Sequence, residues 1–296
     1  MEKLHTGRFS LLQNLWKTGK LSTFIIPVLM SCHPPKNKNV LETVKLPAGE
    51  VKMFNNENLK VSIGELEVMK YEVTNSAFKK FVDGTHYITT AERNGESMIF
   101  DYSTGKWILQ PGADWNHPKG KESNIHGKEF YPVVHVSYED ACAYCEWINM
   151  RLPYESEWEY VSKINEKDND QKYNSWQGIF PYKDEGKDGF KGTSPVGIFS
   201  SDENAICDLK GNVWEWCLDY YHQDWPELVA DIEPNKRITG PLKPYSENVI
   251  YDTLRVIKGG SFLCSENYCE GYKSLKRKSA DPKLSYEHIG FRCVKE

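Results

Sequence analysis

The sequence contains 296 residues, of which 39% are hydrophobic and 27% are charged, and its formal net charge is -5. This composition is ordinary for a globular protein, and the length suits one large domain or two small ones. No block of basic residues points to nucleic acid as a partner, and no acidic tail points to a polyvalent partner.

The first predicted element is an export signal. Lys17 and Lys20 precede an apolar run, residues 24–30, which is far too short to span a membrane. A basic flank, a short apolar core and small residues at the cut are typical of a secretory signal. The run ends in Leu-Met-Ser followed by Cys32, which resembles a bacterial lipobox. A buried apolar segment that happens to contain a cysteine is the alternative.

We therefore expect residues 1–32 to be a lipoprotein signal whose Cys32 thiol is lipidated. The protein would then be exported and lipid-anchored to a bacterial membrane, facing the periplasm or the cell surface. Residues 33–43 begin with His-Pro-Pro-Lys-Asn-Lys-Asn and read as a solvated tether. In an oxidising space, disulfides become possible and calcium becomes a plausible ligand.

Regular elements are expected to begin at residue 44. Residues 44–49 read as a short strand and a turn, and Thr74 can cap a helix that continues through Phe78 and Val82. Ser137-Tyr-Glu-Asp140 resembles a capping box.

The helix that Ser137 opens places Ala141, Tyr144, Cys145 and Ile148 on one face. Leu152-Pro153 is expected to start a further helix, with Glu155, Glu157 and Glu159 near its positive end. Past residue 165 the chain is dominated by Gly, Pro, Asp and Asn, and such long loops are usually functional or held by ions. The sequence therefore predicts one α+β domain with much irregular loop structure.

Several segments together resemble the sulfatase-modifying-factor domain, which is the fold of formylglycine-generating enzymes. They are Tyr71-Glu-Val-Thr-Asn75, Pro132-Val-Val-His-Val-Ser137, Arg151-Leu-Pro-Tyr-Glu-Ser-Glu-Trp-Glu-Tyr160, Gly211-Asn-Val-Trp-Glu-Trp216, Lys258-Gly-Gly-Ser261 and Gly290-Phe-Arg-Cys293. The match implies a single formylglycine-generating-enzyme-like, C-type-lectin-like domain over residues 44–296. The signature alone does not fix a function, because the same fold serves sulfoxide synthases, binding modules and structural lipoproteins.

Cys264 and Cys269, just after Gly-Gly-Ser261, resemble the paired cysteines of the true formylglycine-generating enzymes. Two thiolates are soft ligands that select Cu(I) over harder metals. Spacing alone, in an exported protein, favours a structural disulfide between them. The resemblance instead implies a redox-active, copper-binding pair at the centre of catalysis.

The same alignment implies further site residues. Ser261 and Arg277 fall on family positions for proton handling and substrate orientation, and Trp214 and His288 fall on substrate-binding positions. His288 stands where animal members carry Asn, which places the substrate contacts in question more than the copper chemistry.

The resemblance also implies two calcium sites in the loops. Asn174, Ser175, Asp188 and Phe190 fall on the first site, and Asp208, Gly211, Val213 and Glu215 fall on the second. Hard oxygen ligands drawn partly from the backbone suit Ca²⁺. Without the resemblance, Asn and Asp in loops usually only form turns.

Cys145 and Cys293 match a family disulfide that joins the central helix to the C-terminal strand. A second family disulfide would need cysteines at 162 and 274, where this chain has Ser162 and Ser274. Cys142 and Cys207 are expected to be buried as small hydrophobic residues.

The leading functional hypothesis is a copper-dependent oxidase that uses O2 to convert a substrate protein cysteine to Cα-formylglycine, with Cu(I) and Ca²⁺ as cofactors. Its partner would be an unfolded sulfatase, or another protein, with a Cys-x-Pro-x-Arg motif. The alternative is a non-catalytic surface lipoprotein that binds peptide or glycan, as in secretion or gliding machinery, but such a module has no need of the cysteine pair. A thiol–disulfide exchanger is less favoured, because the chain lacks the usual Cys-x-x-Cys motif.

Overall fold

A computed structural model of the chain describes most residues from Leu41 onward. The described residues are 41–54, 56, 58–165, 173–199, 205–229, 240–247, 253–265, 267–269 and 276–296. The expected signal with Cys32, and most of the expected tether, therefore lie outside the described residues. Among the helices that are described, none is long and apolar enough to cross a membrane.

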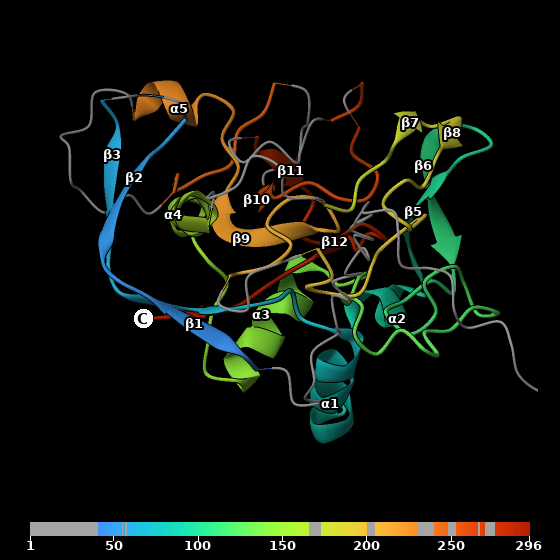
Figure 1. The fold of residues 1–296 in the computed structure, drawn as a ribbon. Coiled ribbons are helices and arrows are strands. Elements are labelled where there is room, and N and C mark those ends of the chain that lie inside the picture. The colour runs from blue at the N-terminus through green and yellow to red at the C-terminus, as the bar shows by residue number, and fades with distance from the viewer. Residues whose placement is uncertain are drawn as a thin grey trace, which may run out of the picture. The chain divides into compact units, whose positions relative to one another are not determined.

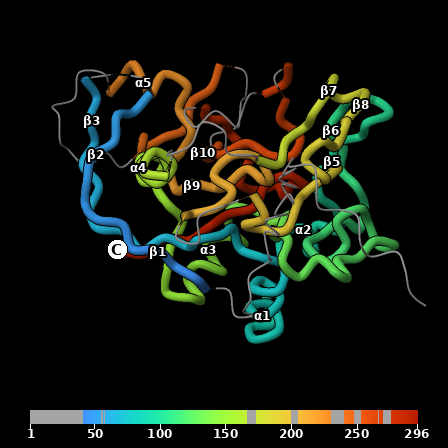
Figure 2. The backbone as a smooth tube through the Cα atoms, viewed as in Figure 1, coloured from blue at the N-terminus to red at the C-terminus, as the bar shows by residue number. Residues whose placement is uncertain are grey.

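Two sheets hold the described part of the chain together. The first is antiparallel, has the order β1-β4-β13, and joins β1 (Thr43–Leu46), β4 (Leu66–Met69) and β13 (Val294–Lys295). The second has the order β11-β10-β9-β12 and joins β9 (Trp214–Tyr220), β10 (Arg255–Lys258), β11 (Lys278–Ala280) and β12 (Ile289–Gly290). Only the β12–β9 pair of this sheet is parallel. Strands late in the chain thus pair with strands from its beginning and middle, and the C-terminal end lies beside β1 in Figure 2.

Three hairpins complete the strands of the described residues. They are β2 (Gly49–Lys52) with β3 (Lys60–Ile63), β5 (Glu96–Asp101) with β6 (Lys106–Pro111), and β7 (Gly178–Ile179) with β8 (Lys183–Asp184). The expected strand and turn at residues 44–49 correspond to β1 and the turn into β2.

Within the described residues the helices are α1 (Asn75–Thr85), α2 (Thr90–Asn94), α3 (Tyr138–Trp147), α4 (Glu155–Asn165) and α5 (Trp225–Leu228). Capping side chains start three of them, α1, α2 and α3, whereas α5 has no side-chain cap. Thr74 caps α1 by accepting a hydrogen bond from the Ala77 N–H, and Ser137 forms a capping box with Asp140 at the start of α3. Both predicted helix starts are confirmed.

The start of α4 differs from the expectation by two residues. The helix begins at Glu155 rather than at Leu152-Pro153, because the Pro153 carbonyl accepts a hydrogen bond from the Leu218 N–H of β9 (2.9 Å). The first turn therefore carries Glu155 and Glu157, while Glu159 lies beyond it. Figure 1 shows α4 end-on beside β9 and β10, and it also packs against the β2–β3 hairpin.

The main core forms between α1, α3 and the four-stranded sheet. The face of α3 expected from its spacing is buried: Ala141, Tyr144 and Cys145 all lie in this core. Cys145 forms a disulfide with Cys293, the residue before β13, across a sequence separation of 148 residues. The predicted disulfide is confirmed, and it links the central helix to the C-terminal strand.

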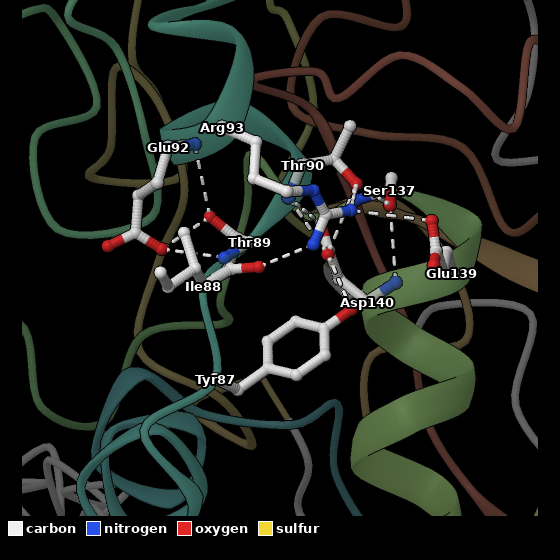
Figure 3. Close-up of polar contacts among 9 residues, drawn as sticks. All are labelled: Tyr87, Ile88, Thr89, Thr90, Glu92, Arg93, Ser137, Glu139 and Asp140. Carbon is white, nitrogen blue, oxygen red and sulfur yellow. Dashed lines mark hydrogen bonds and ion pairs between the residues drawn. The ribbon is translucent and has the colours of Figure 1, made fainter.

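A buried polar contact fixes α2 against the start of α3. The Asp140 carboxylate accepts hydrogen bonds from the Thr90 N–H (3.0 Å) and from the Tyr87 hydroxyl (3.1 Å), as Figure 3 shows. Burial raises the pKa of Asp140, while these donors act in the opposite direction. Arg93 of α2 completes the contact by pairing with Glu139 (3.4 Å). Since α2 leads directly into β5, this contact sets where the β5–β6 hairpin lies.

Candidate active site

A cavity of about 430 Å³ opens beside the four-stranded sheet. Its walls come from the β5–β6 hairpin, from the segment that follows β10, and from β11 and β12. They consist of Met98, Trp107, Trp214, Ile257, Ser261, Leu263, Cys264, Tyr268, Cys269, Lys278, Ser279, Ala280, Tyr286, His288 and Ile289. Five of the side chains singled out from the sequence, Ser261, Cys264, Cys269, Trp214 and His288, therefore meet at one cavity.

Cys264 and Cys269 lie side by side in the cavity wall and form a disulfide, with their Cα atoms 5.4 Å apart. Cys264 is fully buried, whereas Cys269 is partly exposed. Gly259 and Gly260 adopt positive φ angles of 96° and 81°, which turn the chain sharply after β10 and into the cavity wall. The structure therefore contains the disulfide that spacing alone favoured, and it places this disulfide in the wall of the cavity.

Ser261 lies next to the buried sulfur. Its N–H donates a hydrogen bond to the Cys264 Sγ (3.4 Å), and its hydroxyl lies 3.9 Å from the same sulfur. The hydroxyl also accepts a hydrogen bond from the Leu263 N–H (3.3 Å), which holds the turn closed. The Ser261 hydroxyl is thus within reach of the cysteine pair.

His288 and Trp214 also line the cavity, and the Trp214 N–H donates to the His288 carbonyl (2.9 Å). The His288 ring packs on Trp107 with ring centroids 4.4 Å apart, and its buried Nδ1 has no hydrogen-bond partner among the described residues. Burial, with a smaller contribution from His135, lowers the pKa of His288 to about 3. The imidazole is therefore neutral near pH 7.

Arg277 lies apart from the cavity walls. Its guanidinium forms two hydrogen bonds with the Glu155 carboxylate, from Nε (2.8 Å) and from Nη2 (2.9 Å), and its Nη1 donates to the His222 carbonyl. Of the side chains expected around the cysteine pair, Arg277 is the one that the structure does not bring to the cavity.

The sequence analysis did not identify several residues that line the cavity. Met98 and Trp107 come from the β5–β6 hairpin, and Tyr268 stacks on Phe180 with ring centroids 4.1 Å apart. Aromatic residues at alternate positions of the hairpin, Phe100 and Tyr102 among them, were a usable signal for a strand with an apolar face. Their placement at this cavity depends on long-range packing, which the local pattern does not contain.

The residues expected at the first calcium site form a hydrogen-bonded loop. The Asp188 carboxylate accepts from the Ser175 N–H (3.1 Å), the Phe190 N–H (2.9 Å) and the Gln177 side-chain amide (2.6 Å). The Asn174 amide donates to the Gly192 carbonyl (2.7 Å). Ser175 and Phe190 thus lie around the Asp188 carboxylate, and Asn174 precedes Ser175 in the same loop.

The residues expected at the second calcium site lie directly beside the first. Asn174 pairs with Gly211, where an added Cβ would come within 2.0 Å of the Asn174 carbonyl oxygen. Asp208 accepts from the Gly197 N–H (2.5 Å), and the backbone from Gly211 to Val213 runs on into β9.

Glu215 of the second set is buried and engaged by other side chains. Its carboxylate accepts from Arg292 at Nε (2.7 Å) and at Nη2 (2.6 Å), and from the Trp158 indole N–H (2.8 Å). Glu215 therefore offers a cation fewer free lone pairs than an unpaired carboxylate would.

Glu72 is a carboxylate in this region that the sequence reasoning missed. It is buried, its Oε1 accepts from Asn212 (3.0 Å), and its Oε2 has no hydrogen-bond partner in the part of the chain that the structure describes. Burial and the neighbouring Asp208 raise the pKa of Glu72 well above its usual range. Burial likewise raises the pKa of Asp208 to about 6. An excess of buried carboxylates with an unpartnered oxygen fits a hard divalent cation.

The described residues contain no group of three or more His, Cys, Asp or Glu side chains arranged to hold a metal ion. The expected calcium ligands are mostly amide and backbone oxygens, and the expected copper ligands are two sulfurs. Neither set would form a group of that kind.

The three other cysteines among the described residues have different environments. Cys207 and Cys217 are buried, and Cys142 is half-buried against the main core. Burial is confirmed for Cys207 and is only partial for Cys142. Ser162 is buried in α4, and Ser274 lies outside the described residues.

Comparison with known proteins shows the family. Residues 31–296 match the Sulfatase-modifying factor enzyme 1-like domain. The chain is 37% identical to a formylglycine-generating enzyme of Thermomonospora curvata over 263 residues, which covers 79% of this chain and 83% of that protein. It is 35% identical to a formylglycine-generating enzyme of Mycobacterium tuberculosis over 298 residues, covering 86% of this chain and 97% of that protein.

The fold is shared with more distant proteins. The structure of PvdO from Pseudomonas aeruginosa matches with a TM-score of 0.60 at 20% identity, covering 86% of this chain and 94% of that one. These matches confirm the predicted α+β fold. The chain belongs to the sulfatase-modifying factor family, among relatives that are named formylglycine-generating enzymes.

Proposed function

We propose that this protein oxidises a cysteine of a substrate protein to Cα-formylglycine, with O2 as the oxidant and Cu(I) held by Cys264 and Cys269. One observation carries the proposal: the two cysteines lie side by side in the wall of a cavity large enough to admit a side chain. The similarity to formylglycine-generating enzymes over most of the chain supports it. A module that only binds peptide or glycan has no need of such a pair.

The donor set suits monovalent copper. Once the disulfide is reduced, Cys264 and Cys269 present two sulfur ligands whose Cα atoms are 5.4 Å apart. Thiolates favour soft Cu(I), and they bind it only after losing their protons. Bound copper supplies the O2 chemistry that no side chain can perform.

The overall reaction is balanced by an external thiol. The substrate CH₂–SH group becomes CH=O, and its sulfur leaves as hydrogen sulfide. O2 accepts four electrons, two from the substrate and two from a thiol reductant that becomes a disulfide. One oxygen atom is retained in the aldehyde and the other forms water.

The chain's own residues position the substrate and exclude water. Cys269 is the more exposed sulfur, so an entering substrate thiol meets it before the buried Cys264. Trp214 and Trp107 form an apolar wall, and holding the reacting carbon against that wall removes much of the entropic barrier. The neutral His288 can accept or donate a hydrogen bond within this wall without adding a charge.

The proposed partner is an unfolded sulfatase, or another protein, with a Cys-x-Pro-x-Arg motif. Only an extended segment can bring a backbone-flanked cysteine into a cavity of about 430 Å³. The test is an aerobic assay of reduced, copper-loaded protein on such a peptide, read by mass spectrometry as loss of sulfur and gain of an aldehyde. Cys264→Ser and Cys269→Ser should each abolish conversion. Binding of an envelope partner without any conversion would favour the binding-module alternative.

Two further proposals concern calcium and location. Ca²⁺ bound near Asp188, and between Glu72 and Asp208, would compensate the negative charge of the carboxylates there.

A lipid on Cys32 would anchor the exported protein to a bacterial membrane. In cells fed labelled palmitate, the label should be recovered on the wild-type protein in the membrane fraction. A Cys32→Ala variant that is still processed and still membrane-bound would refute the anchor.

A further inference from the structure

An exposed apolar surface begins at the wall of the cavity. Tyr268 lines the cavity, and its ring stacks on Phe180 with the ring centroids 4.1 Å apart and an angle of 10° between the planes. Phe180 lies in the turn between β7 and β8, where its neighbours Ile179 and Tyr182 are 65% and 86% exposed. One aromatic contact therefore joins the cavity wall to the exposed side chains of the β7–β8 hairpin.

Buried rings hold the β7–β8 hairpin against the β5–β6 hairpin, and Figure 1 shows the two hairpins side by side. Phe180 packs on Phe100 of β5 with ring centroids 5.0 Å apart, and on Trp176 with ring centroids 5.1 Å apart. Tyr102, which is exposed, stacks on the other partner of this group, Trp176 (5.7 Å). The exposed side chains of the β7–β8 hairpin therefore have a fixed place relative to the cavity.

The β5–β6 hairpin extends the apolar surface in a second direction. Met98 of β5 and Trp107 of β6 both line the cavity. Met98 pairs across the hairpin with Leu109, and residues directly opposite each other lie on the same face of a strand pair. Because Leu109 is exposed, the face that forms the cavity wall continues outward along β6.

Five exposed side chains are thus linked to the cavity wall through ring stacking or strand pairing. We call them the apolar rim: Tyr102, Leu109, Ile179, Tyr182 and Tyr268. Single exposed apolar residues are ordinary on a protein surface, whereas a group of them beside a cavity marks a site of interaction.

The continuity of the rim with the cavity identifies its occupant. A polypeptide that places its cysteine in the cavity must leave the cavity as an extended chain, and an extended chain advances about 3.3 Å per residue. The residues within about four positions of the cysteine therefore reach the rim. Apolar side chains at those positions would be removed from water together with the exposed side chains of the rim, which favours binding.

We propose that the apolar rim binds the residues that flank the reacting cysteine, and that the preferred substrate segments carry apolar side chains at these flanks. The inference rests on the proposed function for the presence of a substrate cysteine in the cavity. Ile179 and Tyr182 are its central contacts, because they are the most exposed side chains of the rim.

The experiment measures the binding of two fluorescent peptides to the full chain without copper. Both peptides contain the Cys-x-Pro-x-Arg core with Ser in place of Cys, so that neither oxidation nor disulfide exchange can occur. They have equal length and differ only in their flanks, which are Leu and Val in one and Ser and Gly in the other. We expect the wild type to bind the apolar peptide about tenfold more tightly, which corresponds to the burial of roughly one apolar side chain.

Ile179→Ser/Tyr182→Ser should reduce this preference to about threefold or less. Both side chains are mostly exposed, so the variant keeps the buried rings that hold the hairpin. Ile88→Ser/Leu228→Ser is the matched control, because these two residues are also mostly exposed and neither lines the cavity. The control should keep the wild-type preference.

A preference that the Ile179→Ser/Tyr182→Ser variant retains, or the absence of a preference in the wild type, overturns the proposal. Self-association of the wild type that this variant abolishes, without a peptide preference, would assign the rim to a second copy of the chain and also overturn it. Oxidation of the corresponding Cys peptides is measured separately. Conversion without a flank preference leaves the proposed function standing, and a flank preference without conversion leaves the rim standing.

Discussion

His288 places an ionisable ring in a cavity wall that keeps it uncharged. Its Nδ1 is buried and has no partner within the described ranges, and its ring packs on Trp107. Protonation would put an unpaired charge in this wall, which is why burial moves its pKa from about 6.5 to about 3. Because the ring is neutral, it does not compensate the negative charge of a thiolate in the cavity, and the thiolate stays available to a soft metal.

The shift at His288 predicts a dependence of stability on pH. Because the folded-state pKa is depressed, the unfolded chain binds more protons between about pH 6.5 and pH 3, so stability falls as pH is lowered through this window. We expect His288→Asn to remove that contribution, so its free energy of unfolding should fall less than that of the wild type between pH 7 and pH 5, by up to about 2 kcal/mol. Denaturant unfolding at both pH values measures this. Parallel pH profiles for the two proteins would contradict it.

Single residues also show where the sequence is informative and where it is not. Cys264 and Cys269 could be assigned to one site because five residues of chain keep them close. Arg277 could not be placed, because several carboxylates compete for an arginine and tertiary packing decides among them. Glu155 is the carboxylate that pairs with Arg277, because it presents both of its oxygens to the guanidinium from the start of α4.

At the scale of elements, the loops of residues 173–199 and 205–213 share one polar interior beside β9. Asn212 links them: its Oδ1 accepts from the Ser194 N–H (2.9 Å) and from Asn174 (3.2 Å), and its Nδ2 donates to Glu72. The conformation of these loops depends on the hydrogen bonds, on buried apolar residues such as Trp176, Val196 and Ile206 and, as proposed, on bound ions.

This arrangement predicts a response to chelation. A cation that binds only the native state stabilises it by mass action, so excess chelator should lower the melting temperature. Asp188→Ala, which removes the central carboxylate of the first loop, should have a lower melting temperature than the wild type and respond less to chelator. Thermal melts with and without chelator, with elemental analysis of the purified protein, measure both effects. Unchanged melting in chelator, together with no calcium, would exclude the ion.

Elements with local signals were predictable and those with distant partners were not. The start of α3 could be predicted because Ser137 and Asp140 cap it from within four residues. The start of α4 was misplaced because the Pro153 carbonyl is taken by Leu218 of β9, more than sixty residues later. The loops were correctly expected from their composition, but Glu72 reaches them from the segment after β4.

At the scale of the whole molecule, one covalent link joins distant parts. The Cys145–Cys293 disulfide connects α3 to the start of β13 across 148 residues. Both cysteines are buried in the main core, beside Tyr144 and Phe291. The link therefore fixes the C-terminal strand to the central helix.

The double variant Cys145→Ser/Cys293→Ser should be destabilised by about 2–5 kcal/mol, because removing the link restores conformational freedom to the unfolded chain. Denaturant unfolding under non-reducing conditions measures the loss. Cys142→Ser is the control, since that thiol is free and half-buried, and its effect should be small. Peptide mapping of mature protein that finds Cys145 and Cys293 as free thiols would refute the link.

The order of the strands has a consequence for how the protein is made. β12 and β13 leave the ribosome after every other described element, yet β12 pairs with β9 in the four-stranded sheet and β13 pairs with β4 at the opposite end of the sequence. Until they emerge, Glu215 lacks the Arg292 guanidinium and the outer edge of β4 lacks its neighbour. Both sheets are therefore completed only when the last strands of the chain have been made.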